Sequence, residues 1–405
     1  MKIKNINPKE IKDSRGNPTV EVEIETGKGK FLGACPSGAS KGKHEAIELR
    51  DEDGKGVKKA ISNIKKIIAP EFKGKEFNGQ KEIDEVLIKL DGTENKSRLG
   101  VNAILPVSIA FCRAFAAENK IPLYKYIRQI FNPQLFTYNF PKPCFNIIEG
   151  GAHAENDLDI QEFMVIPQKQ SFRENFVIAS QIYQNLKEIL EKSGEPGQGD
   201  EGGFAPKISK TEKALFSLKG AIEKFPETRI GLDAAATQFF KDGKYFFEGN
   251  ELTRTELFDF YKDLVNEFPM ITFIEDPFSE EDWTGFSEIN RQLSGKINIL
   301  GDDLLTTNVK RMKEAQDKKA CSGTILKLNQ IGTVTETLAA ANLARSFGWK
   351  LLVSHRSGET HDDFIADLAV GIGADYIKAG APTTPERMVK YNRVMEIESE
   401  LSKNK

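Results

Sequence analysis

The sequence predicts an α/β fold in which a (β/α)8-type barrel follows a smaller α+β domain. The chain has 405 residues, 39% of them hydrophobic, enough for two or three domains with their own cores. Hydrophobic residues alternate with period two near the N-terminus and then change to helical spacing. In the second half, short apolar runs alternate with helical segments, which is typical of βα units built on a parallel sheet.

The first domain is predicted over residues 1–131. Residues 19–25 alternate between apolar and polar, as in a half-buried strand. The glycine-containing turn at 26–30 leads into a returning strand at 31–35. Helical periodicity follows, and the alanine-rich, apolar segment 103–119 is expected to be a buried helix.

The second domain is predicted over residues 132–405, because prolines interrupt both periodicities between residues 132 and 143. In this half, six short apolar runs each end in an ionisable residue: Asp233, Glu275, Asp302, Lys327, His355 and Lys378. From Glu275 onward these residues follow at intervals of 23 to 28 residues, the length of one strand, one helix and two short loops.

The six ionisable residues are expected to surround one cavity, because the carboxyl ends of all strands of such a barrel open on the same mouth. A single Asp after a strand is more often a helix N-cap. Lysine is not a capping residue, so six such positions in register favour a functional site.

The residue types indicate metal-assisted proton transfer. Three carboxylates without cysteine suit a hard divalent cation, above all Mg²⁺. Two neighbouring lysines are expected to have lowered pKa values, because nearby positive charge disfavours the ammonium form. A neutral lysine could then remove a proton α to a metal-bound carboxylate, while the metal stabilises the product dianion.

Two further acids could assist the departure of the leaving group, which is the second half of an elimination. Glu201 lies in a glycine-rich loop, where the backbone can approach a ligand closely, and Glu162 lies in a strand-like run. Neighbouring carboxylates raise the pKa of one of them, which leaves a protonated acid for a leaving group. His153 adds an imidazole, with a purely structural role equally open. The small-residue loop 36–42 is by itself more typical of a connector than of an anion or metal lid.

Over nearly its whole length the chain resembles the enolase family. The resemblance rests on residues 13–22, 199–203, 327–333 and 354–360. It implies a barrel with irregular first units behind a small α+β domain. It also implies a glycolytic hydro-lyase that interconverts 2-phosphoglycerate and phosphoenolpyruvate, with two Mg²⁺ ions per active site, the second bound with the substrate.

The resemblance also implies a role for each site residue. The metal ligands would be Asp233, Glu275 and Asp302 for the first ion and Ser40 for the second. The catalytic residues would be Lys327 as the base and Glu201 as the acid, supported by Glu162 and His153. The substrate-binding residues would be Gln161, His355, Arg356, Ser357 and Lys378.

Four positions depart from the family pattern, namely Lys41 for Thr, Glu149 for Asn, Ala379 for a hydroxyl residue, and residues 383–385 for a segment with Arg and Ser. Drift around an intact site is the simplest interpretation. An alternative is a paralogue that abstracts the α-proton of another phosphorylated or phosphonylated carboxylate. A less favoured alternative is a non-catalytic binding protein.

A formal net charge of −3 gives no electrostatic reason to expect a nucleic-acid or anionic-membrane partner. No uninterrupted run of 18 apolar residues or signal-like start is found, and the four cysteines lie far apart. We therefore expect a cytoplasmic protein with reduced thiols. The resemblance implies a homodimer or larger homo-oligomer, but Glu396 stands where an Arg would pair with Glu21.

Overall fold

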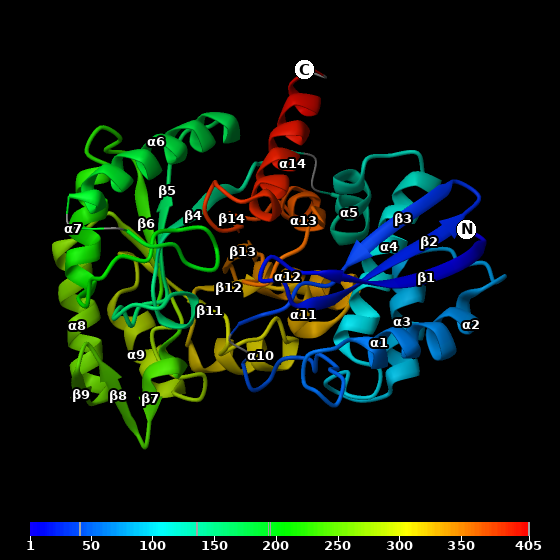
Figure 1. Ribbon diagram of the computed structural model, residues 1–405, viewed down its shortest axis with the longest axis horizontal. Coiled ribbons are helices and arrows are strands. Elements are labelled where there is room, and N and C mark those ends of the chain that lie inside the picture. The colour runs from blue at the N-terminus through cyan, green and yellow to red at the C-terminus, as the bar shows by residue number, and fades with distance from the viewer. Residues whose placement is uncertain (40–41, 135–136, 193, 195, 404–405) are drawn as a thin grey trace.

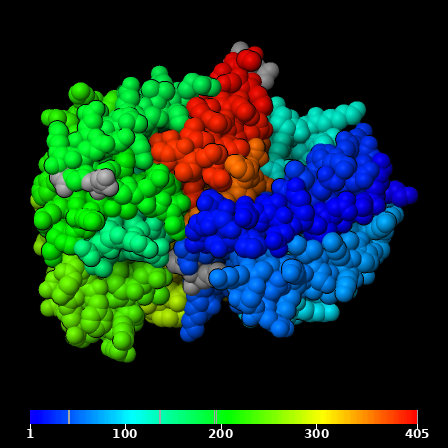
Figure 2. Space-filling view, in the orientation of Figure 1, coloured from blue at the N-terminus to red at the C-terminus, as the bar shows by residue number. Residues whose placement is uncertain are grey.

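The computed structural model describes residues 1–39, 42–134, 137–192, 194 and 196–403. In Figure 1 an N-terminal part, blue to cyan, lies beside a barrel that runs from green to red. The space-filling view shows the blue N-terminal segment packed against the orange and red C-terminal part (Figure 2). This contact includes a hydrogen bond from Ser14 N to Glu359 O of 2.7 Å.

The N-terminal part begins with a three-stranded antiparallel sheet. Its strands, in spatial order, are β1 (Ile3–Lys12), β2 (Pro18–Thr26) and β3 (Gly29–Ala34). On β2, Val20, Val22 and Ile24 are fully buried on one face. The predicted alternation and the returning strand are therefore confirmed.

Six helical segments follow the sheet: α1 (Lys58–Asn63), η1 (Ile64–Ile68), α2 (Ala69–Phe72), α3 (Gln80–Asp91), α4 (Val101–Glu118) and α5 (Leu123–Phe131). Helix α4 packs on β2 and β3. Gly33 in β3 permits the close approach, because a Cβ at this position would lie 2.2 Å from Pro106 O of α4.

Helix α4 is the buried helix that the sequence predicts. Although Arg113 and Asn102 interrupt its apolar run, it is long and apolar enough to cross a membrane by length and composition alone. In the described structure 83% of that stretch is buried. Core helices of globular domains pass the same test, and the packing of α4 against the sheet accounts for its composition.

The second part is a closed eight-stranded barrel. Around the barrel its strands follow in the order β10 (Ile271–Glu275), β11 (Asn298–Gly301), β12 (Gly323–Leu326), β13 (Lys350–Ser354), β14 (Tyr376–Lys378), β4 (Lys142–Glu149), β5 (Glu162–Ile166) and β6 (Arg229–Asp233). Strand β5 runs antiparallel to both β4 and β6, and the other pairs are parallel. The irregular first units are thereby confirmed.

The remaining elements surround the barrel. The helices are α6 (Phe172–Glu191), α7 (Thr211–Ala221), α8 (Arg254–Glu267), α9 (Trp283–Gln292), α10 (Val309–Lys318), α11 (Leu328–Ile331), α12 (Val334–Ser346), α13 (Phe364–Ile372) and α14 (Pro385–Ser402). Two short 3-10 turns are η2 (Gly151–His153) and η3 (Ala236–Phe239). A small sheet of β7 (Phe240–Lys241), β8 (Lys244–Phe247) and β9 (Asn250–Leu252) projects at the lower left of Figure 1.

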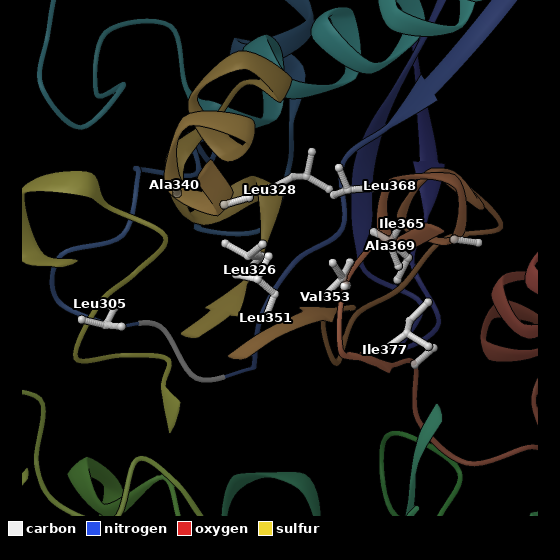
Figure 3. Close-up of a cluster of buried hydrophobic side chains, with 14 of the residues drawn as sticks. Leu305, Leu326, Leu328, Ala340, Leu351, Val353, Ile365, Leu368, Ala369 and Ile377 are labelled. Atoms are coloured by element: carbon white, nitrogen blue, oxygen red, sulfur yellow. The ribbon is translucent and has the colours of Figure 1, made fainter. Parts of the chain in front are cut away.

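The barrel strands are apolar on both faces because both faces are buried. On β13, Leu352 belongs to an inner cluster with residues such as Phe273 and Leu300, whereas Leu351 and Val353 belong to the outer core. Figure 3 shows Leu351 and Val353 of β13 in one hydrophobic cluster with Leu368 of α13. The alternation of strand side chains thus fills the barrel and seats its helices.

Each of the six predicted apolar runs is a barrel strand whose carboxyl end carries the expected residue. Asp233, Glu275 and Lys378 are the last residues of β6, β10 and β14. Asp302, Lys327 and His355 directly follow β11, β12 and β13. The domain boundary between residues 131 and 132 stays a prediction; it lies between the end of α5 and the start of β4.

Candidate active site

A cavity at the carboxyl end of the barrel gathers most of the predicted site residues. Its lining is Gly38, Ala39, His153, Gln161, Glu162, Glu201, Asp303, Lys327, Ser354, His355, Arg356, Ser357 and Lys378. A larger cavity of about 830 Å³ adjoins it and shares His153, but holds no other predicted site residue. The smaller cavity is the chemically relevant one, because acids, bases and a guanidinium converge on it.

Lys378 lies among the carboxylates of three acidic side chains. Its Nζ is 2.8 Å from Glu275 Oε2, 3.2 Å from Glu162 Oε2 and 3.4 Å from Asp233 Oδ2. Each of these side chains is at most 4% exposed. Burial disfavours the ammonium, but the three carboxylates outweigh it and raise the pKa of Lys378 well above its usual range.

Lys327 pairs with Asp302, whose other carboxylate oxygen accepts a 2.8 Å hydrogen bond from Gln330 Nε2. Burial opposes the charge on Lys327, but Asp302 outweighs burial and raises its pKa. The expected lowering of the lysine pKa values is therefore wrong for the site that the chain builds by itself. The carboxylates outnumber the lysines, so attraction exceeds the repulsion between the two ammonium groups.

The three predicted metal ligands come from consecutive parallel strands and present only carboxylate oxygens. Among the described residues, two sets of side chains bring their ligand atoms within 4.8 Å of one another and could hold a metal ion. One consists of His153, Glu162 and Glu201, and the other of Asp276, Asp302 and Asp303. Lys378 bridges Asp233 and Glu275, and Lys327 pairs with Asp302.

Even so, the donor set fits a hard cation. The Oε1 atom of Gln161 is buried and has no hydrogen-bond partner, while its amide lies 3.4 Å from Asp233 Oδ2. Oxygen donors without sulfur favour Mg²⁺ or a similar ion. Ser40, assigned to the second ion, lies outside the described residues, and so does Lys41.

Glu201, Glu162 and His153 line the cavity and lie close to one another. The Nδ1 atom of His153 is 3.7 Å from Glu162 Oε1 and 3.8 Å from Glu201 Oε1. Burial and the neighbouring Glu201 raise the pKa of Glu162 well above its usual range, although Lys378 opposes this. Burial also disfavours the charge on Glu201, and the neighbouring His355, His153 and Arg387 oppose this effect. The ligand atoms of Glu162, Glu201 and His153 lie within 4.8 Å of one another, so one proton shared by the two acids is favoured over two ionised carboxylates.

Arg387 of α14, which is fully buried, fixes the tautomer of His355. One guanidinium nitrogen lies 2.7 Å from His355 Nδ1 and can only donate a hydrogen bond. Nδ1 must therefore be unprotonated, so the proton of the neutral ring is on Nε2. This nitrogen is 3.1 Å from Glu201 Oε2, although the pair is not aligned as a full hydrogen bond. Asn146 Nδ2 donates to the same oxygen at 3.1 Å.

His355 is expected to stay neutral, with its proton on Nε2, between pH 5 and 8. Burial is the first cause that lowers its pKa, to about 3. The chain has four histidines, so nitrogen NMR of protein labelled only at histidine can resolve the ring, and its signal is identified by its loss in His355→Gln. An Nδ1–H tautomer, or protonation above pH 5, would contradict the assignment.

The same pKa shift affects stability. The unfolded chain takes up a proton at His355 near the usual histidine value of about 6.5, whereas the folded chain does so only near 3. His355 therefore contributes a stability that is present above about pH 6.5 and is lost as the pH falls toward 3.

The lining of the cavity also includes the fixed positive charge of Arg356. Arg356 donates to Glu45 at 2.8 and 3.2 Å and to Asn329 Oδ1 at 3.0 Å. Ser357 Oγ accepts a 2.7 Å hydrogen bond from Ala39 N. Ser357 and Arg356 are therefore tied to Ala39 and Glu45 of the N-terminal part, and the guanidinium is positioned to meet an anionic group.

The structure adds site residues that the sequence analysis missed, namely Glu45, Asn146, Asp303 and Arg387. None of them directly follows an apolar run, which is the pattern that identified the others. Asp303 comes nearest to it, because it follows Asp302. Arg387 lies in the first turn of α14, where nothing in the local sequence indicates contact with His355. Glu149 was noted only as a departure from a family pattern.

Comparison with known proteins agrees with this geometry. A family model described as "Enolase, N-terminal domain" matches residues 3–127, and one described as "Enolase, C-terminal TIM barrel domain" matches residues 137–405. A curated protein named enolase, from Methanocaldococcus jannaschii, is 50% identical over 417 aligned residues. The alignment covers 100% of this chain and 97% of that protein.

Proposed function

The chain belongs to the enolase family and is a hydro-lyase of glycolysis, and we propose a role for each of its site residues in the reversible dehydration of 2-phosphoglycerate to phosphoenolpyruvate. The supporting observation is that Lys327, which follows β12, lines one cavity together with Glu162 of β5 and Glu201 of the glycine-rich loop. One group can take the α-proton while the other side assists the leaving hydroxyl.

The metal cofactor is assigned to the strand-end carboxylates. Asp233, Glu275 and Asp302 would hold one Mg²⁺, and Ser40 would hold a second together with the substrate phosphate. A divalent cation bound there would stabilise the negative charge that develops on the substrate carboxylate as the α-proton leaves. The supporting observation is the all-oxygen donor set, including the free Gln161 Oε1.

Lys327 is proposed as the base. Its backbone N–H donates to Thr307 Oγ1 at 3.0 Å, which holds the residue where β12 ends. Asp302 stabilises its ammonium, while Arg356 and Lys378 disfavour it. A cation that engages Asp302 would therefore shift Lys327 toward the neutral amine that can accept a proton.

Glu201 is proposed as the group that delivers a proton to the departing hydroxyl. In the resting site Glu201 would share that proton with Glu162, and His153 Nδ1 lies 3.7 Å from Glu162 Oε1 and 3.8 Å from Glu201 Oε1. In the hydration direction the ionised Glu201 would accept a proton from the incoming water. Lys378, Arg356, Ser357, His355 and Gln161 would hold the anionic ends of the substrate.

Purified protein incubated with 2-phosphoglycerate and Mg²⁺ is expected to form phosphoenolpyruvate, which is followed by its ultraviolet absorbance. Absence of turnover with every divalent cation tested would refute the proposal. Weak turnover beside strong turnover of a phosphonylated analogue would favour the paralogue hypothesis, which rests on Lys41, Glu149 and residues 383–385.

We also propose a cytoplasmic homodimer or larger homo-oligomer. All four cysteines are free and buried, as expected in a reducing compartment. Within one chain Glu21 pairs with Lys9 at 2.6 Å and Glu396 with Arg393 at 3.2 Å. Because both acids already have partners, an interface would depend on other contacts.

A further inference from the structure

We propose that Glu149 is a positioning residue that holds the backbone of the loop carrying Glu201, so that this acid faces the leaving hydroxyl. The inference rests on the proposed role of Glu201 in the elimination. Glu149 is the last residue of β4 and is fully buried. It replaces the Asn that the family resemblance leads one to expect.

The carboxyl group of Glu149 binds the loop through both oxygens. Its Oε2 accepts a 3.0 Å hydrogen bond from Glu201 N, and its Oε1 accepts a 2.6 Å hydrogen bond from Gly203 N. A side chain from a barrel strand thus contacts the backbone of the proposed acid itself. The rigid strand transmits its position to Glu201.

The other amides of the loop are bonded to backbone carbonyls. Gly199 N donates to Gly203 O, Gly202 N donates to Gly199 O, and Asp200 N donates to His153 O. Glu149 therefore takes the two amides that the backbone leaves over. A buried N–H without an acceptor is destabilising, so loss of this carboxyl group would favour a rearranged loop.

The space beneath the loop is shaped around the carboxyl group. A Cβ at Gly199 would lie 2.3 Å from Glu149 Oε2, and a Cβ at Gly203 would lie 2.8 Å from Glu149 Oε1. Glycine at both positions lets the loop rest directly on the carboxyl group. The glycine-rich sequence here is thus matched to Glu149 as well as to the cavity.

The charge of Glu149 agrees with a supporting role. Among the described residues no Lys, Arg or His forms an ion pair with it, and its hydrogen-bond donors are backbone amides. Burial and the nearby Glu201 raise its pKa well above the usual range. The two backbone amides oppose this shift, because each donates to one oxygen of the carboxylate.

Two side-chain contacts depend on this loop position. Asn146 Nδ2 and His355 Nε2 both lie 3.1 Å from Glu201 Oε2. A displacement of about 1 Å at a reacting group costs on the order of 100-fold in rate. Lys327 follows β12 and has no contact with this loop among its hydrogen bonds, so α-proton removal should be preserved.

The test is Glu149→Gln, in which one oxygen becomes an amide that faces a backbone N–H. The turnover number for dehydration is expected to fall by about 10- to 100-fold, with little change in KM. Exchange of the α-proton of 2-phosphoglycerate with deuterated solvent is expected to continue. The rise in the ratio of exchange to dehydration distinguishes misplacement of the acid from a general loss of folded enzyme.

Glu398→Gln is the matched control, because the Glu398 carboxylate also accepts from two backbone amides, Phe172 N at 2.7 Å and Arg173 N at 3.1 Å. It should leave the exchange ratio unchanged. If Glu149→Gln does not fold, Glu149→Asn replaces it, with the same rise in the ratio expected. Full dehydration activity, or an equal fall in both rates, would overturn the proposal. Failure of the wild-type protein to turn over 2-phosphoglycerate would instead refute the proposed function.

Discussion

Lys327→Ala is expected to lower the turnover of 2-phosphoglycerate by about 100- to 10,000-fold, the range that a positioned general base contributes. Lys327 directly follows β12 and lines the cavity, and its ammonium is held by Asp302. Its removal should also stop α-proton exchange with solvent, which is measured by NMR in deuterated water. This readout reports on proton removal separately from loss of the hydroxyl.

Lys350→Ala is the matched control. Lys350 begins β13 at the opposite end of the barrel and pairs with Asp375 at 2.9 Å. It should retain both turnover and exchange. Exchange that persists in Lys327→Ala would exclude Lys327 as the base and would direct attention to Lys378, the other buried lysine of the cavity.

Glu275→Gln is expected to abolish stabilisation by Mg²⁺ and to lower turnover by at least about 100-fold, since even indirect partners of metal ligands contribute 10- to 100-fold. In the wild-type protein, Mg²⁺ at 100 times its Kd should stabilise the fold by about 2.7 kcal/mol and raise Tm. The variant loses a ligand charge, so its Tm should no longer respond. Thermal unfolding with added Mg²⁺ or chelator measures both.

Glu336→Gln provides the comparison, because Glu336 also pairs with a buried lysine, at 2.8 Å from Lys96 Nζ, away from the cavity. Its Tm should respond to Mg²⁺ as the wild type does. An unchanged response in Glu275→Gln would remove Glu275 from the ligand set, and an absent response in the wild type would contradict the metal assignment.

Local sequence predicted much of the barrel half. A short apolar run that ends in an ionisable residue is visible without tertiary information, and each of the six runs is a strand. The reversal of β5 was not visible in the same way. Residues 162–166 are all buried, and a continuous apolar run reads the same in a parallel or an antiparallel strand.

Charge states could not be inferred from residue types. Two lysines close together suggested lowered pKa values, yet Lys378 contacts three carboxylates and Lys327 contacts one. The sign of a pKa shift depends on burial and on the sum of all neighbouring charges. Those neighbours come from separate strands, and their distances follow only from the folded barrel.

The sequence by itself determined which residues reach the mouth of the barrel, because strand periodicity and the residue at each strand end are local properties. Only the tertiary structure decided how those residues are held. Arg387 in α14 sets the tautomer of His355, and Glu149 in β4 supports the loop of Glu201. Hydrogen bonds of this kind depend on sub-ångström placement of elements far apart in the chain, and no local pattern encodes that placement.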